Sequence, residues 1–207
     1  MANRLIIILA VGLLAAAGCG SSPTPRSATA ASSSASTTSP RSGVGALSGE
    51  AASAATGDIP DNQVFLTFHD PGTGYSISYP EGWARKGTSA DTTFADKNNV
   101  VHIVIAKAAP ATTSSVAAEL TRLKQSNPSL TSTRPAIAHL KSGIPAIKST
   151  YTTRSAPDPV TGKTVVLVVD RYELSGAGKR ATVDLGTPKG VDNVDAYRMM
   201  INSFRWQ

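Results

Sequence analysis

The stretch Pro157 to Thr164, PDPVTGKT, ends in Gly-Lys-Thr, as a phosphate-binding P-loop does. A P-loop also needs a glycine at the position of Pro157 and a helix after the lysine and threonine. Here the next residues are VVLVVD, a composition that favours a strand. Asp158, Pro159 and Gly162 are turn-forming residues, so the stretch predicts a hairpin turn rather than a nucleotide site.

The three histidines are the next candidates for chemistry, as metal ligands. They are His69, His102 and His139, and no two of them fall on one predicted element. A metal site would therefore need the fold to gather them, and we expect no metal and no cofactor. His102 shares a predicted strand face with Val100 and Val104, which indicates a partly buried, hydrogen-bonded side chain.

Arrangements for nucleophilic catalysis are missing from the sequence. It contains no Gly-x-Ser-x-Gly, Ser-x-x-Lys or Lys-Thr-Gly motif. Asp170 and Glu173 flank Arg171 near a predicted strand end, and surface ion pairs explain these three charges. We therefore expect no enzyme, while an enzyme with an unrecognised site stays open as an alternative.

The single cysteine, Cys19, lies where an apolar segment ends. Arg4 precedes 13 residues, Leu5 to Ala17, that are all apolar or glycine. A membrane-spanning helix needs about 20 such residues, whereas the apolar region of a signal peptide needs about 7 to 15. The segment therefore predicts a signal peptide.

The stretch Ala16-Ala17-Gly18-Cys19 resembles a bacterial lipoprotein signal, although leucine is commoner in that family at the position of Ala16. The resemblance implies that residues 1–18 are removed and that Cys19 carries a diacylglyceryl group, usually with a further N-acyl chain. Two chains anchor a protein stably where one holds it only marginally. We therefore expect a lipid-anchored protein on the extracytoplasmic face of the cell membrane.

A polar tether is predicted to follow the anchor, so that residues 19–57 comprise the lipidated cysteine and a disordered segment. Residues 20–57 contain 11 Ser, 5 Thr and 9 Ala, with no aromatic residue. Such a segment buries too little apolar surface to offset the entropy lost on ordering.

The formal charge of +6 does not indicate nucleic-acid binding. Residues 58–207 hold 17 Lys and Arg against 13 Asp and Glu, interspersed along the chain with no basic run longer than two. The clustered basic face needed to follow a phosphate backbone is therefore not evident, and we expect no nucleic-acid partner.

Residues 58–207 are predicted to form one α+β domain. The pattern gives four strands, a helix over residues 112–127, four more strands and a C-terminal helix. In that last helix Asp192 is the expected cap, and Val194, Tyr197, Ile201 and Phe204 share one face. Most connections are too short for parallel crossovers, so we expect an antiparallel β-sheet flanked by helices.

Three features resemble a PsbP/Mog1-like domain of the kind found in bacterial lipoproteins, the LpqN type. They are GYSISYPEGW at residues 74–83, one helix between two sheet-forming blocks, and VDAYRMMINSFRW at residues 194–206. The resemblance covers residues 64–207 and implies an α/β/α sandwich with accessory or binding roles and no shared catalytic residues. The residues that carry it are expected to build the core, and they are Tyr79, Pro80, Gly82, Trp83 and Phe204.

The expected function is that of a non-enzymatic binding or accessory module, with another envelope protein as its partner. The alternative is a carrier that holds a lipid, a glycan or a small hydrophobic ligand in a cleft between sheet and helices. A large apolar pocket would favour the carrier, and a filled core with an exposed apolar patch would favour protein docking.

The lipid anchor gives the first testable prediction. We expect Cys19→Ser to leave the domain folded but to release the protein from membranes, because the acyl chains are attached at that sulfur. Membrane fractionation together with circular dichroism measures both effects. Retention of the variant in membranes at the wild-type level would contradict the prediction.

Overall fold

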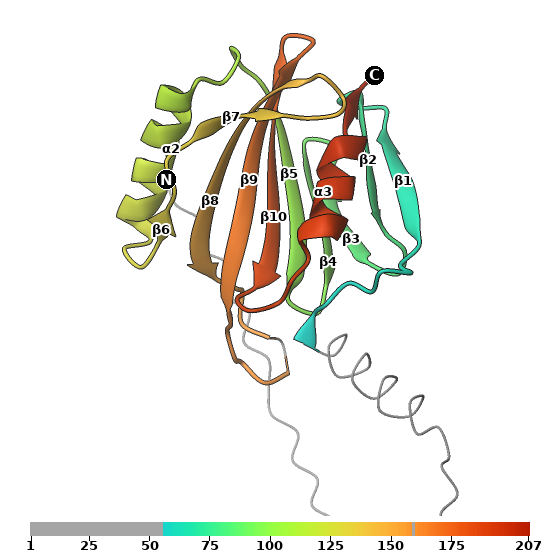
Figure 1. Ribbon diagram of the computed structural model, residues 1–207, viewed down its shortest axis with the longest axis vertical. Helices are drawn as coiled ribbons and strands as arrows, with labels where there is room; N and C mark the ends of the chain where they lie inside the picture. Colours follow the sequence, from blue (N-terminus) through green and yellow to red (C-terminus); the bar gives the residue numbers. More distant parts are fainter. Residues whose placement is uncertain (1–55, 159) are drawn as a thin grey trace, which may run out of the picture. The chain divides into compact units, whose positions relative to one another are not determined.

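The computed structural model describes residues 56–158 and 160–207, whose elements are shown in Figure 1. The predicted leader, Cys19 and nearly all of the predicted tether lie outside these residues. The strands and helices, in chain order, are β1 Phe65–Asp70, β2 Tyr75–Pro80, β3 Ala84–Thr88, β4 Asp91–Asp96, β5 Asn99–Lys107, α2 Thr113–Ser126, β6 Thr131–Ser132, β7 Ala136–His139, β8 Pro145–Arg154, β9 Val166–Gly176, β10 Lys179–Pro188, α3 Val194–Ser203 and β11 Arg205–Trp206.

The strands of the described residues form two sheets. The small sheet has the order β1-β2-β11, and the large sheet has the order β3-β4-β5-β10-β9-β8-β6, with β7 also paired to β8. Every pair is antiparallel. The α+β class predicted from the sequence is confirmed, but the strands divide between two sheets where one was expected.

The large sheet is covered on both faces. One face packs against α3 and the small sheet, and this interface is the main core. In it the rings of Tyr75 and Phe204 stack at 5.6 Å between centroids. The other face carries α2, whose Val116 and Leu120 pack on Ile147 of β8. Figure 1 shows α2 beside β6 and β8 at one edge of the large sheet and the small sheet at the opposite edge.

The helix predicted over residues 112–127 is observed as α2, with Thr112 and Asn127 as its caps. The Thr112 hydroxyl accepts a hydrogen bond from the backbone N–H of Ser115, and the Thr112 N–H donates to the Ser115 hydroxyl. This reciprocal pair satisfies groups that a helix start leaves unpaired.

Strands β3, β6 and β11 were not predicted. All five residues of β3 are exposed, so its sequence ARKGT lacks the apolar alternation by which half-buried strands are recognised. The other two strands have only two residues each and leave no pattern. The pairing of these strands with their neighbours, rather than their own composition, makes them strands.

The turn after β2 lies one residue later than the sequence predicts. The Trp83 N–H donates to the Pro80 carbonyl at 3.3 Å, so Pro80 is the first residue of the turn rather than the second. Gly82 is the third residue of the turn. Its φ of 88° is a backbone conformation that residues other than glycine rarely adopt. The turn directs Trp83 into the core, where it is buried.

The predicted face of α3 is wrong at its first residue. Val194 is 58% exposed, while Met200, which was not assigned to the face, is fully buried with Tyr197 and Ile201. The helix begins at Val194, and this residue lies on its solvent-exposed side, away from the buried Tyr197, Met200 and Ile201. Asn193, not Asp192, is the residue at the cap position, although the Asp192 carboxylate accepts from the Val194 N–H at 3.2 Å.

Among the described residues no helix is both long enough and apolar enough to cross a membrane.

Candidate functional site

A buried side chain, that of Asn193, fixes the segment that precedes β1. Its Oδ1 accepts from the Ile59 N–H at 2.8 Å. Its Nδ2 lies 3.0 Å from the Gly57 carbonyl, 3.1 Å from Asn99 Oδ1 and 2.8 Å from Thr187 Oγ1. One amide therefore joins the start of α3 to β5, to β10 and to a segment more than 130 residues earlier in the chain.

Gly57 belongs to this ordered segment, although the composition of residues 20–57 predicts that it is part of the tether. It is buried, and its carbonyl accepts from Asn99 Nδ2 at 2.5 Å as well as from Asn193. Its φ of 107° is a backbone conformation that glycine adopts readily and other residues rarely do.

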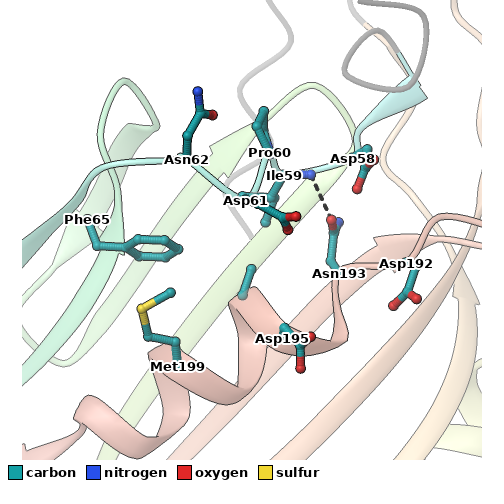
Figure 2. A pocket seen from close by; sticks show the side chains of 11 residues that line it. Asp58, Ile59, Pro60, Asp61, Asn62, Phe65, Asp192, Asn193, Asp195 and Met199 are labelled. Carbon is teal, nitrogen blue, oxygen red and sulfur yellow. Dashed lines mark hydrogen bonds between the residues drawn. The ribbon is translucent and has the colours of Figure 1, made fainter. Parts of the chain in front are cut away.

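A hollow of about 580 Å³ lies between this segment and α3. Figure 2 shows it with the residues that line it, and we call it the acidic hollow because they include four aspartates and no lysine or arginine. The lining residues are Asp58, Ile59, Pro60, Asp61, Asn62, Phe65, Asp192, Asn193, Asp195, Ala196 and Met199.

The carboxylates of the acidic hollow are poorly neutralised. Asp195 forms an exposed ion pair with Arg198 at 2.8 Å, and exposed pairs are worth little. Within the described part of the chain, Asp58, Asp61 and Asp192 form no ion pair within 4.0 Å. Three of the four carboxylates are therefore available to pair with a cationic group.

One end of the acidic hollow is apolar. Figure 2 shows the Phe65 ring and the Met199 side chain turned toward one another at one end, away from Asp58 and Asp192. Met199 is half exposed, whereas the next residue of α3, Met200, is buried in the core. The hollow therefore combines negative charge with an accessible apolar contact.

A second cavity, of about 390 Å³, lies between the β7–β8 hairpin and the residues that lead into α2. We call it the edge cavity. Most of its lining is apolar, and its residues are Pro110, Ala111, Ile137, Ala138, His139, Leu140, Gly143, Ile144, Pro145, Ala146, Ile147, Glu173 and Ser175. The Ala111 N–H donates to the Ser175 hydroxyl at 3.0 Å, which fixes the chain before α2 beside the cavity.

Glu173 is the fully buried acid in the lining of the edge cavity. Its Oε2 accepts from the Thr182 hydroxyl at 2.9 Å and lies 3.3 Å from Arg180 Nε. Its Oε1 has no hydrogen-bond partner among the described residues. Burial raises the pKa of Glu173 to about 7, against the lowering effects of Thr182 and Arg180.

The interpretation of Arg171 and Glu173 as surface ion pairs is wrong, because both side chains are largely buried, whereas Asp170 does form a partly exposed ion pair. They lie inside β9, and Arg171 forms two hydrogen bonds with buried Asp184, at 2.7 and 2.6 Å. The Tyr151 hydroxyl adds a third bond to that carboxylate at 3.1 Å. Burial of the Tyr151 ring and the nearby Asp184 charge raise the pKa of this phenol.

The burial of Arg171 and Glu173 was not predicted, because it arises from α2, which covers the face of the sheet on which they lie. A strand that carries charges usually has one solvated face, and the sequence does not show which face a distant helix covers. One signal was present, because these charges interrupt a long apolar run, which is typical of a strand covered on both faces. Asp170 lies on the opposite face and pairs with Lys148 at 2.8 Å.

The P-loop-like stretch forms the hairpin loop that the sequence predicts. The Asp158 carboxylate accepts from the Thr161 N–H at 2.7 Å, and the Asp158 N–H donates to the Lys163 carbonyl at 2.8 Å. Gly162 has φ of 67°, and the loop joins β8 to β9. The backbone N–H groups of Val160, Thr161 and Gly162 donate to Asp158, so they do not point toward a phosphate as those of a P-loop do.

The histidines lie on β1, β5 and β7. His69 bonds Gln207 at 2.7 Å, and His102 bonds Asp91 at 2.8 Å, which is the hydrogen-bonded position predicted for it. In residues 56–158 and 160–207 no three His, Cys, Asp or Glu side chains are grouped so as to hold a metal ion.

The five residues of the sequence signature lie near β2 and α3, and none lines the acidic hollow or the edge cavity. Tyr79 is partly buried and stacks on Phe94 at 4.3 Å between ring centroids. Pro80, Trp83 and Phe204 are buried, while Gly82 is exposed in its turn.

Comparison with solved structures shows the fold. The chain is similar to cyanobacterial PsbP (CyanoP) from Synechocystis sp. PCC 6803, with a TM-score of 0.52 and 15% identity, over 74% of this chain and 99% of that one. The Ran-binding protein Mog1p of Saccharomyces cerevisiae aligns at a TM-score of 0.47 and 9% identity, over 70% of this chain and 96% of that one. No family model and no curated protein sequence matches the chain. The domain therefore has an α+β fold similar to that of PsbP, and at 15% identity the similarity concerns the fold alone.

The Glu173 carboxyl predicts a pH dependence of stability. Its pKa is higher in the folded protein, about 7, than the ordinary value of 4.5, so the folded state binds the proton more tightly between these limits. The stabilisation of the folded state by the protonated Glu173 carboxyl is complete below pH 4.5 and is lost as the pH rises through 7. At about 1.4 kcal/mol per pH unit the loss is about 3 kcal/mol.

Urea unfolding of the wild type and of Glu173→Gln at a series of pH values isolates this contribution, because the amide does not titrate. The charged groups near Glu173 are Arg180 on β10, Glu119 on α2 and Arg171 on β9, and they are present in both proteins, as is His139, which lines the same cavity. The wild type should lose stability relative to the variant between pH 4.5 and 7.5. Parallel stability curves would refute the assigned environment of this carboxyl.

Proposed function

We propose that the chain is a lipid-anchored cell-envelope protein whose domain is a non-enzymatic module that binds another protein at the acidic hollow. The observation that best supports a protein-binding role is that the hollow is lined by four aspartates and no basic residue, in a domain that is basic overall. The PsbP/Mog1-like fold suggests a non-catalytic accessory or binding module. Membrane attachment rests on the lipoprotein-like sequence around Cys19.

The partner that fits the acidic hollow is a basic segment of a protein. A lysine or arginine would meet the carboxylates of Asp58 and Asp61, which have no ion-pair partner in the described chain. An apolar neighbour of that residue would cover Met199, which is half exposed. Such charge complementarity around an apolar contact gives both specificity and a fast association rate.

The hollow is suited to docking because its walls are already in place. Asn193 lines it and forms hydrogen bonds to Ile59, Gly57, Asn99 and Thr187. A partner would therefore lose little affinity to ordering this surface, because its backbone is fixed before binding.

A photo-crosslinker incorporated at Met199 in intact cells tests the proposal. We expect it to capture a protein through a Lys- or Arg-containing segment, identified by mass spectrometry of the crosslinked peptide. Capture of no protein, or capture only through acidic segments, would contradict the docking role of the acidic hollow.

Charge reversal at the hollow gives a quantitative test. With the purified partner, Asp61→Lys should weaken binding to the full chain at least about tenfold, because it places a cation where the partner supplies one. The control is Asp91→Lys, which makes the same charge change at an exposed residue on β4 that does not line the hollow. Equal affinities of the two variants would show that the partner binds elsewhere.

A further inference from the structure

Strand β1 forms an open edge of the small sheet. In the order β1-β2-β11 it pairs with β2 alone, and Figure 1 shows β2 between β1 and α3. The open edge of β1 therefore lies on the side away from the helix that lines the acidic hollow. Leu66, Thr67 and His69 of this strand are exposed, so a further chain can reach the edge.

The hydrogen bonds between β1 and β2 fix which backbone groups of β1 are already used. The Glu81 N–H donates to the Val64 carbonyl at 2.8 Å. Along an antiparallel pair of strands, residues that bond the partner strand alternate with residues that do not. The alternate residues Leu66 and Phe68 therefore bond β2 as Val64 does.

The residues between them turn their backbone groups to the open edge. These residues are Phe65, Thr67 and His69, and in the described chain their N–H and C=O groups have no hydrogen-bond partner. The alternation is confirmed on the other side of β2, where the N–H of Ser78, which lies opposite Thr67, donates to the Ser203 hydroxyl at 2.7 Å. The open edge thus presents a row of donors and acceptors that another strand can pair with.

Strand β1 lacks the features that protect the other outer strands of the described residues. Edge strand β3 carries Arg85 and Lys86, while β6, β7 and β11 have only two, four and two residues. Strand β1 has six residues in unbroken register with β2, contains no Lys, Arg or Pro, and buries its one acidic residue, Asp70. Charged or very short edges resist pairing with another chain, whereas an edge like β1 favours it.

The charges beside the two halves of β1 are opposite in sign. Glu81 lies at the start of the strand, and Arg85 Cζ lies 5.1 Å from the centre of the Phe68 ring in the second half. In the described part of the chain neither Glu81 nor Arg85 forms an ion pair within 4.0 Å. An antiparallel copy of β1 would bring the acidic start of one strand beside the basic half of the other. A parallel copy would place like charges side by side, so the charges favour a two-fold arrangement.

We propose that β1 pairs with β1 of a second copy of this chain, antiparallel about a two-fold axis at Thr67, to form a symmetric dimer. In this register Thr67 lies opposite Thr67 of the second copy and Phe65 lies opposite its His69, so the open backbone groups of all three residues are paired. Leu66 then lies opposite Phe68 of the second copy, which adds an apolar contact. The contact area is small, so the dimer is weak. This dimer does not depend on the proposed docking of a partner at the acidic hollow.

Hydrogen exchange and sedimentation of the full chain test the proposal, with Cys19→Ser present so that neither acyl chains nor a disulfide can join two copies. Concentrations from about 10 μM to about 1 mM cover the affinities expected of a small interface. We expect the mass to rise toward that of a dimer, and exchange of the Phe65, Thr67 and His69 amides to slow about tenfold over the same range. The Leu66 amide should exchange slowly at every concentration, because it bonds β2.

Matched variants assign the dimer to this edge. Thr67→Lys should raise the concentration needed for dimerisation at least about tenfold, because it places two cations opposite one another at the axis. Thr88→Lys makes the same change at an exposed residue of edge strand β3 and should leave dimerisation unchanged. Circular dichroism checks that both variants are folded.

Three results would overturn the proposal. The chain could stay monomeric at every concentration. The two lysine variants could dimerise equally, which would place the interface elsewhere. The Phe65, Thr67 and His69 amides could exchange slowly in the monomer, which would show that another part of the same chain covers the edge.

Discussion

The hydrogen bonds of the Asn193 side chain are the interaction on which the proposed docking surface depends. The segment before β1 has few apolar side chains, so burial alone does not fix it against α3. Asn193 binds its backbone at Gly57 and Ile59 and at the same time contacts Asn99 and Thr187. Buried polar networks of this kind specify one arrangement, because any other leaves several groups unpaired. The acidic hollow exists as a defined shape because this arrangement is fixed.

A second constraint arises because both faces of the large sheet are covered. Polar groups beneath α2 lose their water and must find partners within the protein. Arg171 and Asp184 satisfy one another with two hydrogen bonds and a third from Tyr151. Glu173 is satisfied on one oxygen only. Covering this face therefore leaves two buried atoms, Glu173 Oε1 and the Ser149 hydroxyl of β8, without a hydrogen-bond partner among the described residues.

The fold was largely predictable because its elements carry local signals. The apolar spacing of Val116 and Leu120 and the caps at Thr112 and Asn127 define α2, and continuous apolar runs define β5 and β9. The fully exposed β3 has no such signal. The site was not predictable, because the sequence favours Asp192 as the helix cap and the main partners of Asn193 are about 90 to 136 residues away in sequence. The burial of Glu173 likewise depends on the position of α2, which no local pattern encodes.

Amide hydrogen exchange at Ile59 in the full chain tests most directly whether Asn193 holds the acidic hollow in place before any partner binds. The Ile59 N–H should exchange slowly in the wild type, through an opening whose free energy approaches that of amides in β10, because Asn193 Oδ1 accepts its hydrogen bond. In Asn193→Ala the same amide should exchange much faster while the β10 amides stay protected. Exchange of Ile59 at the rate of an unstructured chain in the wild type, or unchanged protection in the variant, would contradict this account.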